Sequence, residues 1–125
     1  MLADTLLKEI MDANEHVVAA LFIEDGQLTI WRGRDDVALP PENKVKDLLF
    51  QRLLINALLS AKKEYTGKLH FDLTRYDLID MVHFGWVRAE KEVILLIIML
   101  KSTNVLAEIE KFQTLISQWK SLSDV

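Results

Sequence analysis

The sequence predicts an α+β fold with three layers, in which a five-stranded, mainly antiparallel sheet lies between helices on both of its faces. The periodic segments follow the order α-β-β-α-β-β-β-α. Residues 17–23 and 93–100 are apolar throughout, which is typical of strands that are covered on both faces. Because one helix layer covers only one face, we expect the central helix on one face and the two terminal helices on the other. The 125 residues suit a single domain over 1–125.

The N-terminal third predicts a helix followed by a β-hairpin. Residues 2–13 repeat apolar side chains at helical spacing, and residues 17–23 form the first strand. Asp25-Gly26 then predicts a type I′ turn, because that turn needs a positive φ at both central positions. The return strand ends near Gly33, and Pro40-Pro41 favours the start of the next helix.

The central helix, residues 42–65, carries more apolar surface than one contact needs. At about 100° per residue, its apolar side chains fall on a broad arc and on a separate narrow stripe. We expect the broad arc to face the sheet and the narrow stripe to face another chain, with the loop of residues 34–41 as the alternative cover. The arc comprises Phe50, Leu53, Leu54, Ala57, Leu58, Ala61 and Tyr65, the stripe comprises Leu48, Ile55 and Leu59, and Arg52, Asn56, Ser60 and Lys63 lie between them.

The C-terminal half predicts three strands and a helix. Residues 69–74 alternate between apolar and polar side chains, as in a half-covered edge strand. Residues 79–87 and 93–100 form a hairpin around Ala89-Glu90-Lys91, and the second of these strands is expected to be central. Residues 105–119 carry one apolar stripe, which predicts a helix packed on the sheet.

Composition excludes several classes of function. The chain has no cysteine, so it forms no disulfide and has no thiolate nucleophile or cysteine metal ligand. Its net charge of −4 counts against nucleic-acid binding. No apolar run approaches the length of a membrane span. We therefore expect a cytoplasmic protein with no nucleic-acid partner and no membrane insertion.

No catalytic or metal-binding residues are predicted. Asp77, Asp80 and His83 are spaced three apart, but in a turn and strand such side chains diverge. His70, Asp72 and Thr74 share a strand face without a nucleophile elbow, so we interpret them as a polar edge-strand face. No cofactor is expected.

Two aromatic positions are open to a binding interpretation. Trp31, Arg32 and Arg34 form a possible ligand or partner loop, although the neighbouring acidic residues favour an ordinary solvated loop. Trp86 precedes a charged turn, where together with Phe84 it would form an exposed docking patch.

The predicted order of elements resembles the roadblock/dynein light-chain domain over nearly the whole chain, and in particular its small stand-alone archaeal members. The resemblance rests on the apolar strand 17–23, the Asp25-Gly26 hairpin, the long helix ending at Tyr65 and the paired strands 79–87 and 92–100. Profilin-like, longin-like and PAS-like domains share similar layers and remain alternatives.

The resemblance implies a non-enzymatic module that dimerises. In that family the middle helices pack together and the third strands pair edge to edge, as homodimers or heterodimers of related chains. Small GTPases and scaffold proteins are the implied partners. The alternative is a PAS- or profilin-like ligand-sensing domain, against which the bulky side chains of the expected core argue. Carried over to this chain, the dimer contacts would be Leu48, Gln51, Arg52, Ile55, Leu59, Leu69, Phe71 and Leu73.

Overall fold

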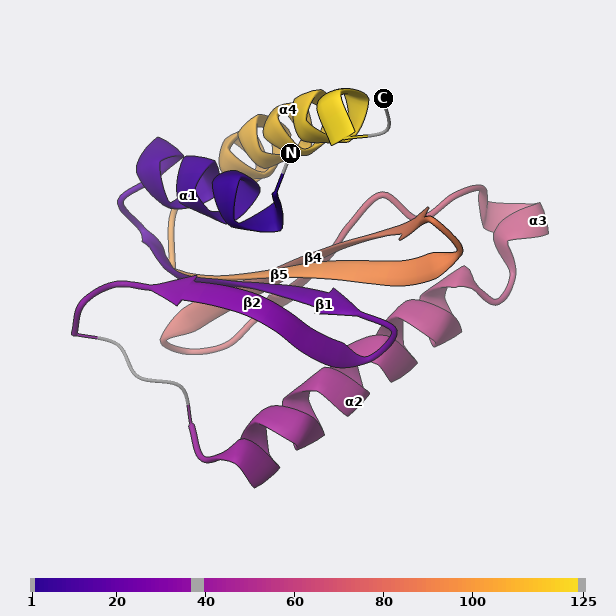
Figure 1. Ribbon diagram of the computed structural model, residues 1–125, viewed down its shortest axis with the longest axis horizontal. Helices are drawn as coiled ribbons and strands as arrows, with labels where there is room; N and C mark the ends of the chain where they lie inside the picture. The colour runs from indigo at the N-terminus through magenta and orange to yellow at the C-terminus, as the bar shows by residue number, and fades with distance from the viewer. Residues whose placement is uncertain (1, 37–39, 124–125) are drawn as a thin grey trace.

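The fold is a single antiparallel sheet between two helical layers. The computed structural model describes residues 2–36 and 40–123. Within them, five strands follow the order β2-β1-β5-β4-β3, with α1 and α4 on one face of the sheet and α2 on the other (Figure 1). The predicted fold class is confirmed. The elements are α1 (Ala3–Ala13), β1 (Val17–Glu24), β2 (Gln27–Gly33), α2 (Glu42–Ser60), α3 (Lys63–Thr66), β3 (Asp72–Arg75), β4 (Ile79–Arg88), β5 (Lys91–Leu100) and α4 (Val105–Ser123).

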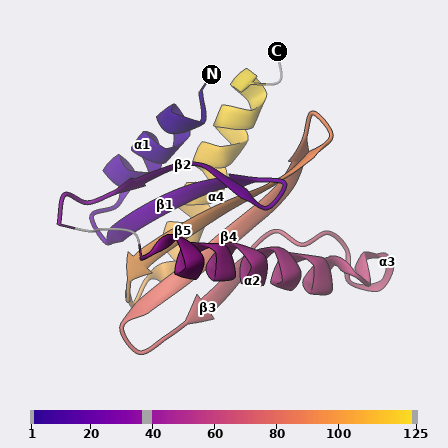
Figure 2. The ribbon, with the colours of Figure 1, turned by 60° about the horizontal axis from the view of Figure 1, so that its bottom comes forward.

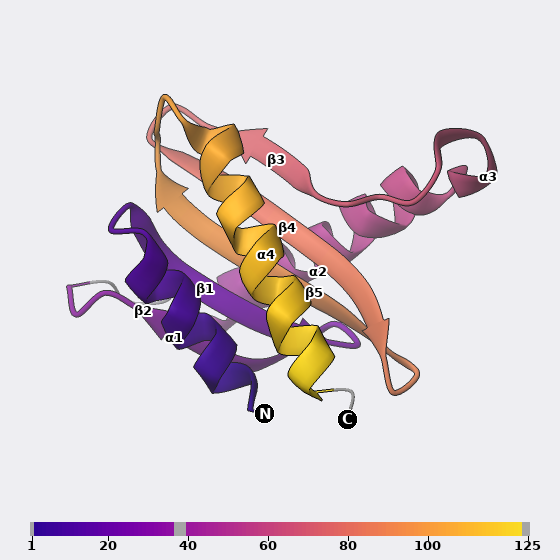
Figure 3. The same cartoon turned by 90° about the horizontal axis from the view of Figure 1, so that it is seen from above.

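The two apolar strands lie where the sequence places them. β1 pairs with β2 on one side and with β5 on the other, so that Leu21 lies between Trp31 and Leu96. Six of the eight residues of β1 and six of the ten residues of β5 are buried, and most of the others lie near the strand ends. α1 and α4 cross one face side by side (Figure 3), and α2 crosses the opposite face diagonally (Figure 2). Burial on both faces explains why neither strand has a polar side.

Both hairpins turn through left-handed backbone. Asp25 has φ 48° and Gly26 has φ 79°, as the predicted type I′ turn requires. The second hairpin places Ala89 and Glu90 in the same region, with φ values of 49° and 65°. Two hydrogen bonds join the hairpins: Asp25 N–H donates to the Glu92 carbonyl at 2.8 Å, and Glu92 N–H donates to Asp25 Oδ1 at 2.8 Å.

Two element boundaries differ from the prediction. The central helix ends at Ser60, because the Ala61 N–H bonds to the carbonyl of Leu58, three residues back, and Lys62 leaves helical geometry with φ −121° and ψ 37°. The separate α3 then ends at Gly67, which has φ 81°. The edge strand begins at Asp72 and not at residue 69, so residues 68–71 approach the sheet without pairing as a strand.

Trp86 belongs to the core, and the prediction of an exposed patch with Phe84 is wrong. The side chain of Trp86 points towards α4 and is only 8% exposed. Its ring meets Phe22 and Trp119 edge to face, with centroids 6.1 and 6.3 Å away. The nearby charged turn suggested that Trp86 is exposed, but the long α4 covers β4 almost to its end and buries this side chain.

Arg32 of β2 and Arg34, which directly follows that strand, hold α1 in place. Arg34 donates to the carbonyls of Met11 and Asn14 at 3.0 and 2.9 Å, and its Nε donates to that of Val17 at 2.8 Å. The last carbonyls of a helix lack partners within it, so a cation at this end is doubly favourable. Arg32 binds the Asp4 carboxylate at the other end of α1, at 2.6 and 2.8 Å.

These contacts count against the predicted ligand loop. Both guanidinium groups bind partners within the chain. The third member, Trp31, is partly buried and packs into the core beneath α2. Trp31, Arg32 and Arg34 therefore lie at the end of β2 and just after it, where the two arginines attach α1 to the sheet.

We expect Arg34→Met to lower the free energy of unfolding by about 2–4 kcal/mol, because three carbonyls lose a charged donor. Urea denaturation measures the change. The matched control is Arg32→Met, which removes an exposed ion pair and should have a smaller effect. Equal losses in the two variants would contradict the role given to Arg34.

Candidate functional site

The helix α2 is rotated relative to the prediction. Val45, Leu49, Arg52 and Asn56 are the buried side chains that face the sheet. The centre of the predicted inward arc instead points to solvent, and we call it the outer stripe. The outer stripe consists of Phe50, Leu54 and Leu58, which are 68%, 48% and 67% exposed. The prediction that these residues face the sheet is wrong.

A buried polar cluster accounts for the rotation. The side chain of Arg52 is fully buried, and its Nη1 lies 3.4 Å from Asp72 Oδ2 and 3.3 Å from Thr74 Oγ1 on β3. Thr74 in turn donates to Asp72 at 3.0 Å. A buried guanidinium without a carboxylate beside it strongly destabilises the folded state. Pairing with β3 therefore turns the polar side of α2 inward, and Arg52, Asp72, Thr74 and His83 form what we call the polar cluster.

One turn further along, Asn56 continues the polar contact with the sheet. Its Nδ2 donates to Glu92 Oε1 on β5 at 2.9 Å. Gly85 of β4 lies directly beneath, and a Cβ atom there would come 2.8 Å from Asn56 Oδ1. A side chain at residue 85 would therefore displace the Asn56 amide from its present position.

The narrow stripe predicted to face another chain lies on the β3 side of α2. Arg52 reaches β3, whereas Leu53 on the opposite flank lies 3.4 Å from the Cβ position of Gly26 in the β1–β2 turn. We call the stripe on the β3 side the β3-side flank: Leu48 and Ile55 are partly buried, and Leu59 is 45% exposed. Gln51 is exposed on the same side of the helix.

Of the predicted dimer residues, those on α2 other than Arg52 lie on the side of the helix next to β3, whereas those on β3 do not turn their side chains to its outer edge. β3 forms an outer edge of the sheet beside the β3-side flank. Phe71 and Leu73 direct their side chains into the core on the α4 face, so this edge offers mainly its backbone. Leu69 is partly buried before the strand begins. Arg52 is buried within the chain, and the prediction that it lies on an interface is wrong.

The histidine of the polar cluster has an unusual environment. His83 is buried on β4, with its Nδ1 3.9 Å from Asp72 Oδ2. Burial lowers the pKa of His83, while the Asp72 carboxylate acts to raise it and the Arg52 guanidinium to lower it further. His70 is exposed and precedes β3, so the grouping of His70 with Asp72 and Thr74 does not form; the last two bind Arg52 instead.

The residues spaced three apart also separate in the structure. Asp80 binds Arg75 through two hydrogen bonds of 2.7 and 2.8 Å, and this guanidinium holds the pKa of the Asp80 carboxyl below its usual range. His83 faces α2, on the opposite side of β4, and Asp77 is an exposed turn residue. Across residues 2–36 and 40–123, no group of three or more histidines or carboxylates could hold a metal ion.

None of the helices in the described part of the chain is long and apolar enough to cross a membrane.

Solved structures share this architecture. A roadblock/LC7 domain from Streptomyces avermitilis is similar with a TM-score of 0.74 and 11% identity, covering 100% of both chains. The gliding protein MglB from Thermus thermophilus gives a TM-score of 0.69 and 12% identity, covering 93% of this chain and 86% of that chain. MglB from Myxococcus xanthus gives 0.64 and 11%, covering 94% and 93%.

The chain has the roadblock/LC7 fold. No protein-family model and no curated protein sequence matches it. The likeness therefore lies in the arrangement of helices and strands. In this chain, the features described above lie on the edge strand β3 and the helix α2.

We expect Asp72→Asn to lower the free energy of unfolding by about 3–5 kcal/mol, because it leaves the Arg52 charge buried without a carboxylate. Arg52→Met should cost less, since the freed Asp72 side chain is 21% exposed and reaches water. Chemical denaturation of both variants tests this order. A larger loss for Arg52→Met would contradict the account of the polar cluster.

We also expect the stability of this roadblock/LC7-fold protein to fall as the pH drops below about 6.5. The folded state keeps His83 neutral, whereas the unfolded chain binds a proton there near that pH, so acid favours unfolding until the lower folded pKa is passed. Denaturation midpoints between about pH 7.5 and 5 measure the slope.

His83→Gln should flatten this slope, whatever it does to the stability at neutral pH. His70→Gln is the control, because His70 is exposed and should leave the slope unchanged. A His83→Gln protein with the wild-type slope would show that this buried histidine does not drive the pH dependence.

Proposed function

We propose that this roadblock/LC7-fold protein is a non-enzymatic interaction module that dimerises and presents a joint surface to a partner protein. One observation carries the proposal: α2 holds apolar side chains on two sides that its own sheet does not cover. The outer stripe faces away from the sheet, and the β3-side flank adjoins the open edge of β3. Apolar surface of this kind on a small protein usually marks a contact site.

The second copy fits the β3-side flank. If β3 pairs with β3 of another copy, two-fold symmetry brings the same patch of each chain together, as in most dimers. The two sheets then continue across the contact, and Leu48, Ile55 and Leu59 of the two α2 helices meet beneath them. A heterodimer with a related chain would use the same geometry. One similar structure is described as MglB with a tetrameric arrangement, with a TM-score of 0.67 and 13% identity.

The outer stripe is left for the partner protein. It points away from the sheet and so stays accessible when the flanks pair. Phe50, Leu54 and Leu58 recur every four residues and span about 12 Å of helix. Two such stripes side by side would form one apolar surface. The fold favours a small GTPase or a scaffold protein as the partner class.

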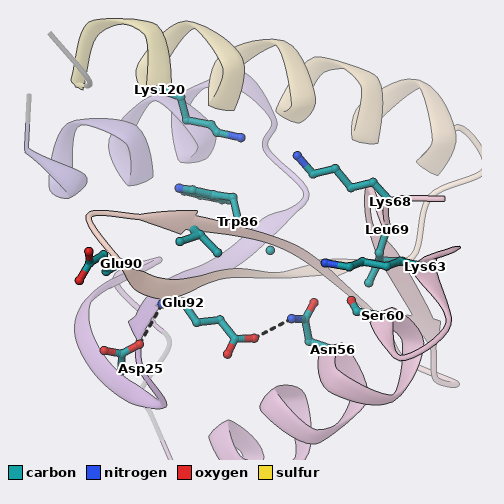
Figure 4. Close-up of a pocket in the computed structure, with 12 residues that line it drawn as sticks. Asp25, Asn56, Ser60, Lys63, Lys68, Leu69, Trp86, Glu90, Glu92 and Lys120 are labelled. Atoms are coloured by element: carbon teal, nitrogen blue, oxygen red, sulfur yellow. Dashed lines mark hydrogen bonds between the residues drawn. The ribbon is translucent and has the colours of Figure 1, made fainter.

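A ligand-sensing role is less well supported. The structure has a hollow of about 650 Å³, but it lies at the edge of the sheet, beyond the end of β3, and its lining carries six charged side chains from several elements (Figure 4). A PAS-like sensor needs its cavity between the sheet and the helix that covers it, where this chain places Leu49, Arg52 and Asn56. This arrangement favours the interaction module.

Two neighbouring leucines of α2 allow the two surfaces to be tested separately: Leu58 belongs to the outer stripe and Leu59 to the β3-side flank. We expect wild-type protein to scatter light as a particle of twice the 14.4 kDa chain mass at micromolar concentration. Leu59→Glu should weaken the dimer at least about a hundredfold, since a desolvated unpaired charge costs several kcal/mol. The matched control Leu58→Glu should stay dimeric and lose the partner protein in pull-downs. A monomeric wild type, or a monomeric Leu58→Glu beside a dimeric Leu59→Glu, would contradict the proposal.

A further inference from the structure

The side chain of Gln51 leaves α2 on the side where β3 forms the edge of the sheet. Arg52 faces the sheet, and consecutive side chains of an α-helix point about 100° apart. The two neighbours of Arg52 therefore point sideways in opposite directions. Leu53 lies towards the β1–β2 turn, 3.4 Å from the Cβ position of Gly26. Gln51 accordingly lies on the β3 side, where it is exposed.

Arg52 also shows which level of α2 lies nearest the middle of β3. Its Nη1 lies 3.4 Å from Asp72 and 3.3 Å from Thr74, the residues on either side of Leu73 in this four-residue strand. When β3 pairs over its full length with β3 of a second copy, the two-fold axis passes through the middle of the pair, perpendicular to the sheet. The same axis then relates the two α2 helices, at the level where Gln51 is the exposed side chain.

Two apolar side chains flank Gln51 at nearly equal distances along the helix. Leu48 lies three residues before it and Ile55 four residues after it, and both are partly buried. A two-fold axis reverses the direction of the second helix, so an axis at Gln51 places Leu48 of each copy against Ile55 of the other. Moving the axis one turn, to Ile55, would instead set each Gln51 against Leu59 of the other copy. The register centred on Gln51 therefore pairs apolar with apolar and polar with polar.

We propose that Gln51 lies on the dimer axis and makes this chain select a second copy of itself. The inference rests on the dimer proposed above. A carboxamide carries both donors and an acceptor, so two Gln51 side chains that face each other pair reciprocally: each Nε2 donates to Oε1 of the other. The contacts of Leu48 with Ile55 on both sides exclude water from this pair.

The reciprocal pair gives the contact its specificity. A single polar residue in an apolar seam between two helices fixes register and partner in coiled coils, at some cost in stability. A related chain with an apolar residue at this position would leave the Gln51 carboxamide buried without a partner, which is unfavourable. The homodimer is therefore preferred to a heterodimer with such a chain.

Two charge substitutions on the full chain test the position of Gln51. Gln51→Glu places two carboxylates face to face in the homodimer, and Gln51→Lys places two ammonium groups there. Each variant alone should self-associate at least about tenfold more weakly than the wild type, because like charges repel across an interface. An equimolar mixture should form dimers at a concentration at which each variant alone is monomeric, because opposite charges then meet on the axis. Sedimentation equilibrium measures all three samples.

Gln118 of α4 provides the matched control. It is exposed, and α4 lies on the face of the sheet opposite α2. Gln118→Glu and Gln118→Lys change the net charge by the same amounts and should dimerise as the wild type does. Recovery of dimers in the mixture of Gln51 variants also shows that both of these proteins are folded.

Two outcomes would overturn this inference and leave the proposed dimer standing. Wild-type self-association of both Gln51 variants, beside a monomeric Leu59→Glu, would place Gln51 away from the axis. Weakening of both Gln51 variants without recovery in their mixture would mean that the two side chains do not face each other. A wild type that is monomeric at micromolar concentration would instead remove the dimer and this inference together.

Discussion

The buried guanidinium of Arg52 sets which side of α2 meets the sheet, and much of the surface follows from that choice. The helix has apolar residues around most of its circumference, so burial of apolar area favours no single rotation strongly. A buried charge left without its carboxylate costs several kcal/mol, and Asp72 on β3 is the carboxylate within reach of this guanidinium. Satisfying it fixes the rotation. Phe50, Leu54 and Leu58 are then left facing solvent, although their hydrophobicity alone would place them inside.

The order of the helices and strands could be predicted because each element depends on local chemistry. Positive φ at Asp25-Gly26 and unbroken apolar runs in β1 and β5 are visible without tertiary information. The rotation of α2 could not be predicted from hydrophobic periodicity, since it depends on a pairing between residues 20 positions apart. The prediction that Trp86 is exposed failed for a related reason, because the rings that cover it belong to Trp119 and Phe22, which are distant in sequence.

Of the two candidate surfaces on α2, the sequence indicated the β3-side flank but not the outer stripe. Surplus apolar residues on α2 indicated a contact beyond the sheet, and Ile55 and Leu59 of the β3-side flank emerge from their spacing. The outer stripe was missed because its residues were assigned to the core on the basis of their hydrophobicity. A usable signal did exist: Arg52 lies in the middle of a polar strip, and Asp72 and Thr74 lie two apart on one face of an alternating strand. An arginine and a carboxylate that both face inward favour each other over solvent.

The position of β1 between β2 and β5 has a consequence for the way the chain folds. Its pairing with β2 is local, and Arg34 ties α1 to the same hairpin. Its pairing with β5 joins Val17 to Met99, near the opposite end of the chain. Contacts so distant in sequence slow folding. During synthesis on the ribosome, the β1 edge of the first hairpin stays unpaired until β5 emerges. This exposed apolar edge makes the nascent chain prone to aggregation at that stage.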